Sequence, residues 1–470
     1  MSNENLTQLT VSQLGQHIQR RDISPVEVAE AYICRIDALE PQLNAFITRL
    51  DEHALREARE AQKEILGGNY RGPFHGIPVG LKDLFWTKDI RTTSGSLIDS
   101  EFVPTADSAV ASQMKVAGAY CIGKLHMTEF AFDGTSLNRY YGPARNPWDL
   151  ARMAGGSSSG PGAAVASGQV PIAMGTDTGG SVRVPAALCG ITGLKPTFGL
   201  ISRYGVTPLS WSMDHVGPMT RTVRDAALAL NMLAGYDSRD PDSVQIAPQD
   251  YLEELGRDIR RIRIGIPQDF IWEVVAPEVE EAFRGATVQL ESLGSLIRET
   301  SFPDMGLINA AGSVVQTSEA ATIHRSRVLA LGQHFDPAIR RRIESGLFIP
   351  AEAYLHAQQV RAKLKEGLLK AMEDADLLAT PTTAIAAPEI GQERATMQGQ
   401  DVPIREALLR ITRVFSTVGL PAISVPCGFT KGGLPVGLQL VGKPFSESLL
   451  LRAAHAYQES TDWHLRRPEV

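Results

Sequence analysis

The hydrophobic pattern at the start of the chain is helical. Apolar residues recur at intervals of three and four from Val26 to Leu39, and Ser24-Pro25-Val26-Glu27 forms a capping box with proline at the first helical position. A second helix is expected over residues 52–66. The pattern therefore predicts that residues 1–70 are mainly helical.

The pattern then changes to that of short buried strands. Residues 76–83 form a short buried strand whose apolar residues lead into Lys82 and Asp83, and residues 119–125 form the next strand. A helix that begins at Asp107 or Ser108 is expected between them. Strand, helix and strand at this spacing indicate an α/β core.

A polar segment at residues 235–248 is predicted to be a surface connection, and further elements follow it. We expect strands at 263–266, 296–299, 376–380, 422–426 and 436–441, helices at 277–293 and 447–459, and a mostly helical stretch over 305–374. Strand 422–426 is expected to pair with 436–441 through a turn at 430–433. This order favours one large α/β domain over residues 1–470.

Composition and charge exclude several classes of protein. Of 470 residues, 43% are hydrophobic and 21% are charged, and the net charge of −7 gives no basic surface for nucleic acid. No run approaches the ~18 apolar residues of a membrane span, and the first ten residues lack the features of a secretory signal. The four cysteines (Cys34, Cys121, Cys189 and Cys427) form no CxxC pair. A cytoplasmic protein is expected.

Glycine is in excess and is concentrated in one segment. The chain has 42 glycines, about 9% against an average near 7%, and eleven of them lie between Gly155 and Gly199. Alanine, valine, isoleucine and leucine are interleaved with them, which a flexible linker would not require. The segment therefore indicates close packing of backbone on backbone, or backbone amides that face a ligand.

Three common kinds of site do not fit the sequence. The ten histidines are dispersed without a zinc-ligand spacing, so no metal is expected. A nucleotide phosphate loop fails because Pro161 follows Gly160. Residues 156–160 match a nucleophile elbow with Ser158 at its centre, but an elbow needs a preceding strand, and residues 146–153 do not form a buried one.

The segment GTDTGGS, residues 175–181, is the remaining candidate. Ser181 follows two glycines, so no side chain obstructs the approach of a carbonyl group. The backbone N–H groups of Thr178, Gly179, Gly180 and Ser181 can converge to form an oxyanion hole. The alternative is a tight Gly-Gly turn with a solvated serine.

Residues 155–217 closely resemble the amidase signature family in GGSSSG, GTDTGGSVRVPA, GITGLKPTFGLIS and DHVGPMTR, and GIPVGLKD resembles the lysine strand of that family. The resemblance extends to GLPAISVP and GLPVGLQLVG near the C-terminus. It implies an α/β fold, a single large domain whose central mixed sheet is covered by helices on both faces. In that domain residues 71–235 would form the signature core, 249–400 a variable helical substrate region, and 401–470 the strands and helix that return to the core.

The resemblance also implies a set of functional residues. Ser181 would be the nucleophile, Ser157 the bridging serine and Lys82 the base, with the family's usual spacings of 75 (157 − 82) and 24 (181 − 157) residues. The peptide bond between Gly156 and Ser157 would be cis. No cofactor is implied.

The chemistry explains why a lysine would serve here. A serine hydroxyl needs a base, no histidine accompanies the motif, and a lysine can act as that base only when it is neutral. Lys82 ends an apolar strand, so burial is expected to lower its pKa, although Asp83 would oppose this if its charge lay close. Ser158, Asp177 and Arg183 are expected to support the site, the last two chiefly by local ion pairing.

The predicted activity is hydrolysis of the C–N bond of a small-molecule carboxamide through an acyl-Ser181 intermediate, with ester or carbamate cleavage as side activities. The main alternative is the glutamine-using A subunit of the transamidosome. In that protein an Asp stands ten residues before the glycine of GLP, where this chain has Leu409, and Ser416 replaces an Asn. Both departures favour a free-standing hydrolase.

An inactive scaffold or binding subunit is the alternative from another class, and the presence of all three residues of the triad argues against it. The expected partner is a small-molecule amide, without nucleic acid or membrane, and the sequence leaves a homodimer open. Specificity is expected from residues 305–400. Apolar and aromatic candidates there are Leu307, Ile308, Val314, Phe348 and Tyr354.

Overall fold

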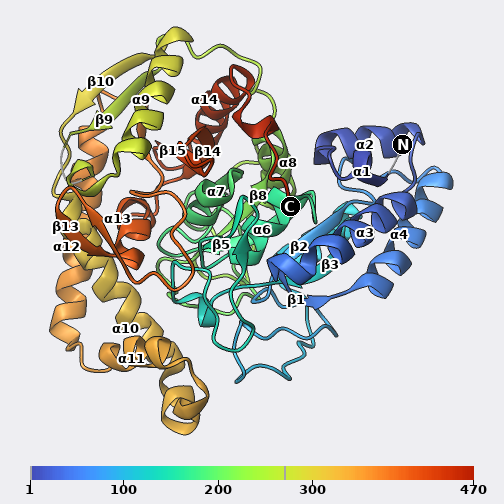
Figure 1. Ribbon diagram of the computed structural model, residues 1–470, viewed down its shortest axis with the longest axis horizontal. Coiled ribbons are helices and arrows are strands. Elements are labelled where there is room, and N and C mark those ends of the chain that lie inside the picture. The colour runs from blue at the N-terminus through green and yellow to red at the C-terminus, as the bar shows by residue number, and fades with distance from the viewer. Residues whose placement is uncertain (1–2, 269–270) are drawn as a thin grey trace.

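An eleven-stranded mixed sheet runs through the computed structural model, which describes residues 3–268 and 271–470 (Figure 1). In spatial order its strands are β1 (Phe46–Arg49), β3 (Tyr120–Leu125), β2 (Pro78–Lys82), β6 (Ile172–Asp177), β8 (His215–Thr220), β7 (Thr192–Lys195), β14 (Ala422–Phe429), β15 (Pro435–Gly442), β11 (Leu377–Pro381), β9 (Arg263–Pro267) and β10 (Leu296–Thr300). Strands β3, β2 and β6 are mutually parallel, and so are β11, β9 and β10, whereas the strands between the two groups pair antiparallel. The predicted mixed sheet is confirmed.

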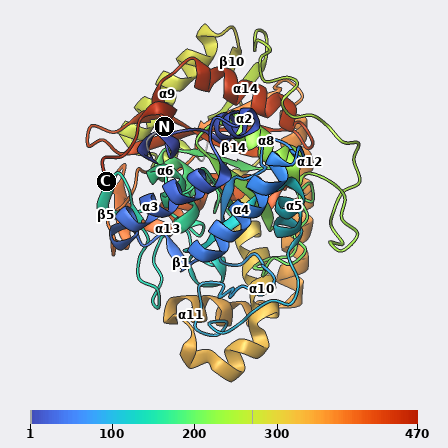
Figure 2. The same cartoon turned by 90° about the vertical axis from the view of Figure 1, so that its right-hand side faces the viewer.

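Helices surround this sheet. They are α1 (Asn3–Leu6), α2 (Val11–Arg20), α3 (Pro25–Leu43), α4 (Asp51–Leu66), α5 (Ala109–Ala117), α6 (Ser159–Ser167), α7 (Arg183–Cys189), α8 (Val223–Leu233), α9 (Pro277–Ser292), α10 (Met305–Leu331), α11 (Pro337–Gly346), α12 (Ala351–Ala371), α13 (Ile404–Thr417) and α14 (Glu447–Glu459). Helices α3 and α4 lie in front when the molecule is turned by 90°, and α11 lies at its lower end in both views (Figures 1 and 2).

Two glycines show that helices cover both faces of the sheet. Gly428 of β14 is paired with Val436 of β15, so both residues point to one face, and Gly437 points to the other. A Cβ atom at Gly428 would lie 3.1 Å from Ala282 of α9, whereas one at Gly437 would lie 2.6 Å from Ala187 of α7. Helices α9 and α7 therefore pack on opposite faces, as expected for a single α/β domain of this class.

The local signals in the sequence are realised in the structure. Helix α3 begins with the capping box at Ser24, whose hydroxyl accepts the amide of Glu27. Ser108 rather than Asp107 caps α5. The predicted hairpin of 422–426 with 436–441 is confirmed as β14 and β15.

Two features differ from the expectation. Helix α13 was not predicted, because no side chain caps its first turn and its apolar positions were assigned no period. Residues 149–153 form a strand, β5 (Asp149–Met153), that pairs with β4 (Arg145–Asn146) in a separate two-stranded sheet. Strand β5 is mostly partly exposed, so the buried strand that a nucleophile elbow requires before Ser158 is lacking, as expected.

Helices α10, α11 and α12 lie in the variable region. Helix α10 packs against α11, α12 and α13, which places this helical layer next to the segment that returns to the core. Strands β12 (Arg394–Met397) and β13 (Gln400–Pro403) form a small hairpin just before α13. Across residues 3–268 and 271–470, none of the helices combines the length and the apolar character that crossing a bilayer would take.

Candidate active site

Parallel strands bring the candidate lysine and the candidate nucleophile loop to one edge of the sheet. Strands β2 and β6 are paired at Gly80 with Ala173 and Leu81 with Met174, so both run toward the same edge. Lys82 is the last residue of β2, and the loop that carries Ser181 follows the end of β6. The sheet thereby places residues a hundred positions apart in one neighbourhood.

Lys82 is fully buried and is held by two hydroxyl groups. Its Nζ donates to Ser157 Oγ and to Thr176 Oγ1, both at 2.8 Å. Burial lowers the pKa of Lys82 to about 7, against the opposing charges of Asp214 and Asp177. The neutral amine is therefore much more accessible near neutral pH than in an exposed lysine.

The carboxylate of Asp83 has other partners, so the condition under which it would oppose the pKa shift of Lys82 is not met. This carboxylate lies 3.3 Å from the Nζ of Lys124 and accepts hydrogen bonds from the amide and hydroxyl of Thr93. The charges that raise the pKa of Lys82 come instead from Asp214 and Asp177.

Ser157 contacts Lys82 and precedes Ser158, the residue that is hydrogen-bonded to the nucleophile loop. The Gly156–Ser157 peptide is cis, which confirms the expectation. A Cβ atom at Gly156 would lie 1.8 Å from the carbonyl oxygen of Thr135, so only glycine fits there. The amide of Ser158 donates to the carbonyl of Ser181 at 3.3 Å, which ties the two serine segments together.

Ser158 has a supporting position. Its hydroxyl donates to the carbonyl oxygen of Thr176 at 3.3 Å, beside the threonine that also contacts Lys82. It is fully buried, whereas Ser181 retains 6% of its surface. Of these two serines, Ser181 is the more accessible to a small substrate.

The backbone of the nucleophile loop differs from the expectation at one residue. The amide of Gly180 donates to Asp177 Oδ1 at 2.8 Å, because the aspartate side chain folds back over its own turn. That amide is therefore occupied. The amides of Thr178, Gly179 and Ser181 have no acceptor in the part of the chain that the structure describes, so the oxyanion hole stays a prediction for these three.

Asp177 and Arg183 form a buried ion pair, as expected. Arg183 donates to both carboxylate oxygens, from Nε at 3.0 Å and from Nη2 at 2.9 Å. Burial alone would raise the pKa of Asp177, but Arg183 holds it well below its usual range. Arg183 also donates to Gln439 and Ser416, both at 2.6 Å, so the C-terminal segment anchors the loop.

Several neighbours of the site were missed by the sequence analysis. Thr176 contacts Lys82, Thr412 of α13 donates to the carbonyl of Gly179 at 2.8 Å, and Ser416 donates to Asp177 at 2.9 Å. In the sequence, Ser416 stands out only as a departure from a family pattern. A local pattern carries no signal for such contacts, because the partners are more than 230 residues apart or lie on different strands.

The proposed lining residues of the variable region differ widely in exposure. Ile308 is buried in the core, whereas Leu307 is 45% and Phe348 is 85% exposed. The hydroxyl of Tyr354 donates to Glu319 at 2.9 Å. Their apolar character alone did not reveal which of them faces a substrate.

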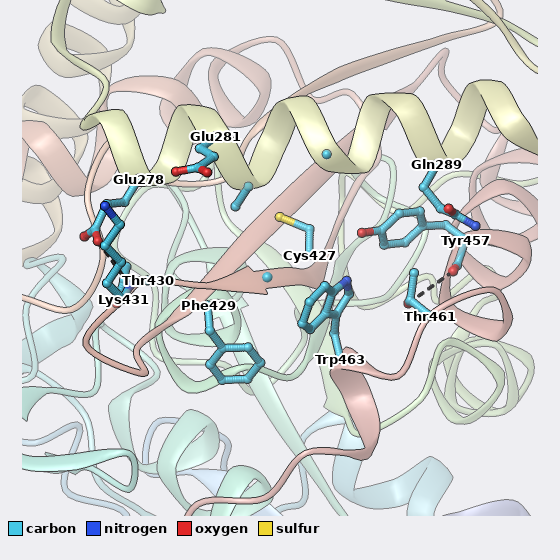
Figure 3. A pocket seen from close by; sticks show the side chains of 13 residues that line it. Glu278, Glu281, Gln289, Cys427, Phe429, Thr430, Lys431, Tyr457, Thr461 and Trp463 are labelled. Carbon is cyan, nitrogen blue, oxygen red and sulfur yellow. Dashed lines mark hydrogen bonds between the residues drawn. The ribbon is translucent and has the colours of Figure 1, made fainter.

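A cavity of about 400 Å³ lies on the face of the sheet that α9 covers, opposite to α7 (Figure 3). Glu278, Glu281 and Gln289 line it from α9, and Cys427, Phe429, Tyr457 and Trp463 line it from the C-terminal elements. None of the three triad candidates borders this cavity. Within the described ranges, no group of three His, Cys, Asp or Glu side chains is arranged to hold a metal ion.

Comparison with known proteins identifies relatives over almost the whole chain. The family model described as Amidase matches residues 27–451. The A subunit of glutamyl-tRNA(Gln) amidotransferase from Methylococcus capsulatus is 40% identical over 484 residues, covering 98% of each chain.

Solved structures are similar over the same extent. One, from a vestigial protein complex described as revealing the evolutionary origins of an s-triazine catabolic enzyme, has a TM-score of 0.94 and 35% identity and covers 98% of this chain and 100% of that one. A bacterial aryl acylamidase of the amidase signature family has a TM-score of 0.90 and 26% identity and covers 97% of both chains.

Proposed function

The chain belongs to the amidase signature family, and from this premise we propose that it hydrolyses the amide bond of a small carboxamide through a covalent ester on Ser181. The observation that carries the proposal is the buried Lys82, with a pKa of about 7, hydrogen-bonded to Ser157 Oγ. A neutral amine in contact with a hydroxyl can take a proton from a nucleophile through that hydroxyl.

The reaction proceeds in two steps. Ser181 Oγ attacks the amide carbon while its proton passes to Ser157 and the Ser157 proton passes to Lys82, and the amides of Thr178, Gly179 and Ser181 bind the oxyanion. The C–N bond then breaks, the leaving nitrogen takes the proton back along the same route, and ammonia or an amine departs. Water attacks the ester in the same way and releases the carboxylic acid.

The test is labelling of Ser181 with a fluorophosphonate, read by intact mass. The wild type gains one adduct, and Ser181→Ala gains none and loses amide hydrolysis by about 10⁴-fold or more. Ser167→Ala, at a buried serine on α6, is the matched control and keeps both the adduct and the amide hydrolysis. Labelling of Ser181→Ala at the wild-type rate would refute the assignment.

The curated relatives favour a second candidate over a free-standing hydrolase. The A subunit of glutamyl-tRNA(Gln) amidotransferase is 40% identical over 98% of the chain, which supports a role as the glutamine-using component of such an enzyme. The apolar Leu409 argues against the second candidate, because its side chain offers no acceptor for the ammonium group of glutamine. Both candidates share the chemistry at Ser181.

A substrate panel distinguishes the two. The chain is assayed alone, and together with the remaining subunits of the amidotransferase from M. capsulatus, on glutamine, primary amides, anilides, esters and carbamates. Glutamine hydrolysis that depends on those subunits supports the second candidate. Turnover of primary amides by the chain alone supports the hydrolase, and ester or carbamate turnover establishes the side activities.

A further inference from the structure

Arg413 of α13 has a buried guanidinium edge without a partner. Its side chain is 2% exposed, yet Nε and Nη2 have no hydrogen-bond acceptor among the residues that the structure describes. On its other side, Nη1 donates to Asn309 Oδ1 at 3.1 Å and to Ser313 Oγ at 3.2 Å, both on α10. Because buried donors are nearly always satisfied, this edge calls for an acceptor from outside the chain.

The same edge of other arginines in this protein holds carboxylates. Three of them donate from Nε and Nη2 to a single aspartate: Arg183 to Asp177, Arg203 to Asp240 and Arg263 to Asp376. This parallel pair of hydrogen bonds is the preferred geometry of guanidinium with carboxylate. The chemistry that fits Arg413 is therefore a carboxylate.

The edge faces the nucleophile loop. A Cβ atom at Gly179 would lie 3.6 Å from Nε of Arg413, and Thr412, the preceding residue, donates to the Gly179 carbonyl. Gly179 lies two residues before Ser181, so their Cα atoms are at most about 7.6 Å apart. A short acyl chain bound at Ser181 can therefore reach Arg413.

The surrounding charges leave a positive excess. Glu406 lies 3.6 Å from Arg413, and Asp133 lies 3.7 Å from Arg405 and 3.8 Å from Arg342, so three arginines face two carboxylates, an excess of one positive charge (3 − 2). Burial lowers the pKa of Arg413 and Glu406 opposes this. One further carboxylate would balance the group.

We propose that Arg413 binds a carboxylate in the acyl part of the substrate, so that this enzyme acts on amides that carry a carboxylate. The class includes glutamine and the monoamides of dicarboxylic acids. The proposal rests on the proposed function, because it requires the scissile carbonyl to lie at Ser181. It makes Arg413 a specificity-determining residue supplied by α13 and oriented by α10.

The test compares three amides with the same carbon chain near the bond: glutaramate, glutamine and valeramide, in which a methyl group replaces the carboxylate. We expect the wild type to have a higher kcat/KM for glutaramate, for glutamine or for both than for valeramide. Comparison of glutaramate with glutamine then shows whether the substrate is a monoamide of a dicarboxylic acid or an amino acid. In Arg413→Met this preference falls by about 10- to 100-fold, mainly through a higher KM for the two substrates that carry a carboxylate. Arg410→Met, on the same helix beside Glu273, is the matched control and keeps the preference.

Equal wild-type turnover of all three amides, or an equal loss on all three in Arg413→Met, overturns the proposal. Since Arg413 is buried, Arg413→Met is checked for fluorophosphonate labelling at Ser181. If that variant does not fold, the wild type is labelled with the fluorophosphonate in the presence of glutarate or valerate. We expect glutarate to slow labelling of Ser181 at a lower concentration than valerate does. Equal protection by the two acids overturns the proposal. A wild type that is neither labelled nor active refutes the proposed function itself, which distinguishes the two failures.

Discussion

Two lysines lie at the ends of the neighbouring parallel strands β2 and β3, buried to the same degree but with different partners. Lys82 and Lys124 are both fully buried, and Lys124 is in register with Leu81, the residue before Lys82. Lys124 lies 3.3 Å from Asp83 and donates to Thr92 and to the carbonyl of Phe85. Lys82 contacts two hydroxyl groups and no carboxylate within ion-pairing distance in the described residues.

The difference shows what separates a structural lysine from the lysine that we propose as the base. Burial lowers the pKa of both, but for Lys124 a carboxylate in contact favours the charged amine. The carboxylates that act on Lys82 belong to Asp214 and Asp177, which act at longer range and are committed to Thr178 and Arg183. At equal burial, the partner therefore sets how strongly the charged form of each lysine is favoured.

The largest expected effect is that of Lys82→Met on chemistry. The rate of fluorophosphonate acylation falls by about 10²- to 10⁴-fold, because the group that takes the proton is removed. The substitution leaves no carboxylate buried without its cation, so we expect no loss in the free energy of unfolding from a broken ion pair. Stopped-time labelling and urea unfolding measure the two quantities, and an unchanged acylation rate would contradict the proposed role.

Lys124→Met is expected to lower the stability of the fold and to leave acylation intact. It leaves Asp83 buried beside no cation, so the free energy of unfolding drops by about 3–5 kcal/mol, while the folded fraction still labels at Ser181. The double variant Lys124→Met with Asp83→Asn is the control and recovers part of the loss. If Lys124→Met instead lost acylation at full stability, the distinction between the two lysines would fail.

The pH dependence of acylation is the next effect in size. Only the neutral amine of Lys82 accepts a proton, and its pKa is about 7. The acylation rate therefore rises about tenfold per pH unit below pH 7 and levels off above it. If the acylation rate levelled off only at about pH 10.4, the ordinary pKa of lysine, the pKa of Lys82 would not be lowered as described.

Thr176→Val has the smallest expected effect. It removes a hydroxyl that accepts a hydrogen bond from Lys82, so the charged amine loses a partner and the midpoint of the pH profile moves to lower pH. The plateau rate changes by less than about tenfold, because Ser157 still contacts the amine. A midpoint that moves to higher pH is the result that would count against this account.

Local patterns in the sequence predicted the parts of the fold that local physics sets. The capping box at Ser24, the cap at Ser108 and the buried run that ends in Lys82 all have the predicted form. The two spacings of the triad came from resemblance to a family, and the structure brings Lys82 into contact with Ser157. These features depend on residues close in sequence or on a motif of fixed spacing.

The rest depends on contacts that no local pattern encodes. The amide of Gly180 looked available because the sequence does not show Asp177 folding back onto it. Asp83 looked like a neighbour of Lys82, but successive residues at a strand end point in opposite directions. The unpartnered edge of Arg413 emerges only when α10, α13 and the nucleophile loop are assembled.

The anchoring of Arg183 by Ser416 and Gln439 has a consequence for synthesis of the chain. Both anchors lie more than 230 positions after the loop that they hold, and two of the Arg183 nitrogen atoms donate to them. Until residue 439 has been synthesised, Nη1 of Arg183 lacks its acceptor, whereas Nη2 can still donate to Asp177. We therefore expect a chain that ends before residue 416 to lack both anchors, so that the Asp177–Arg183 pair beside Ser181 has no support from the C-terminal segment.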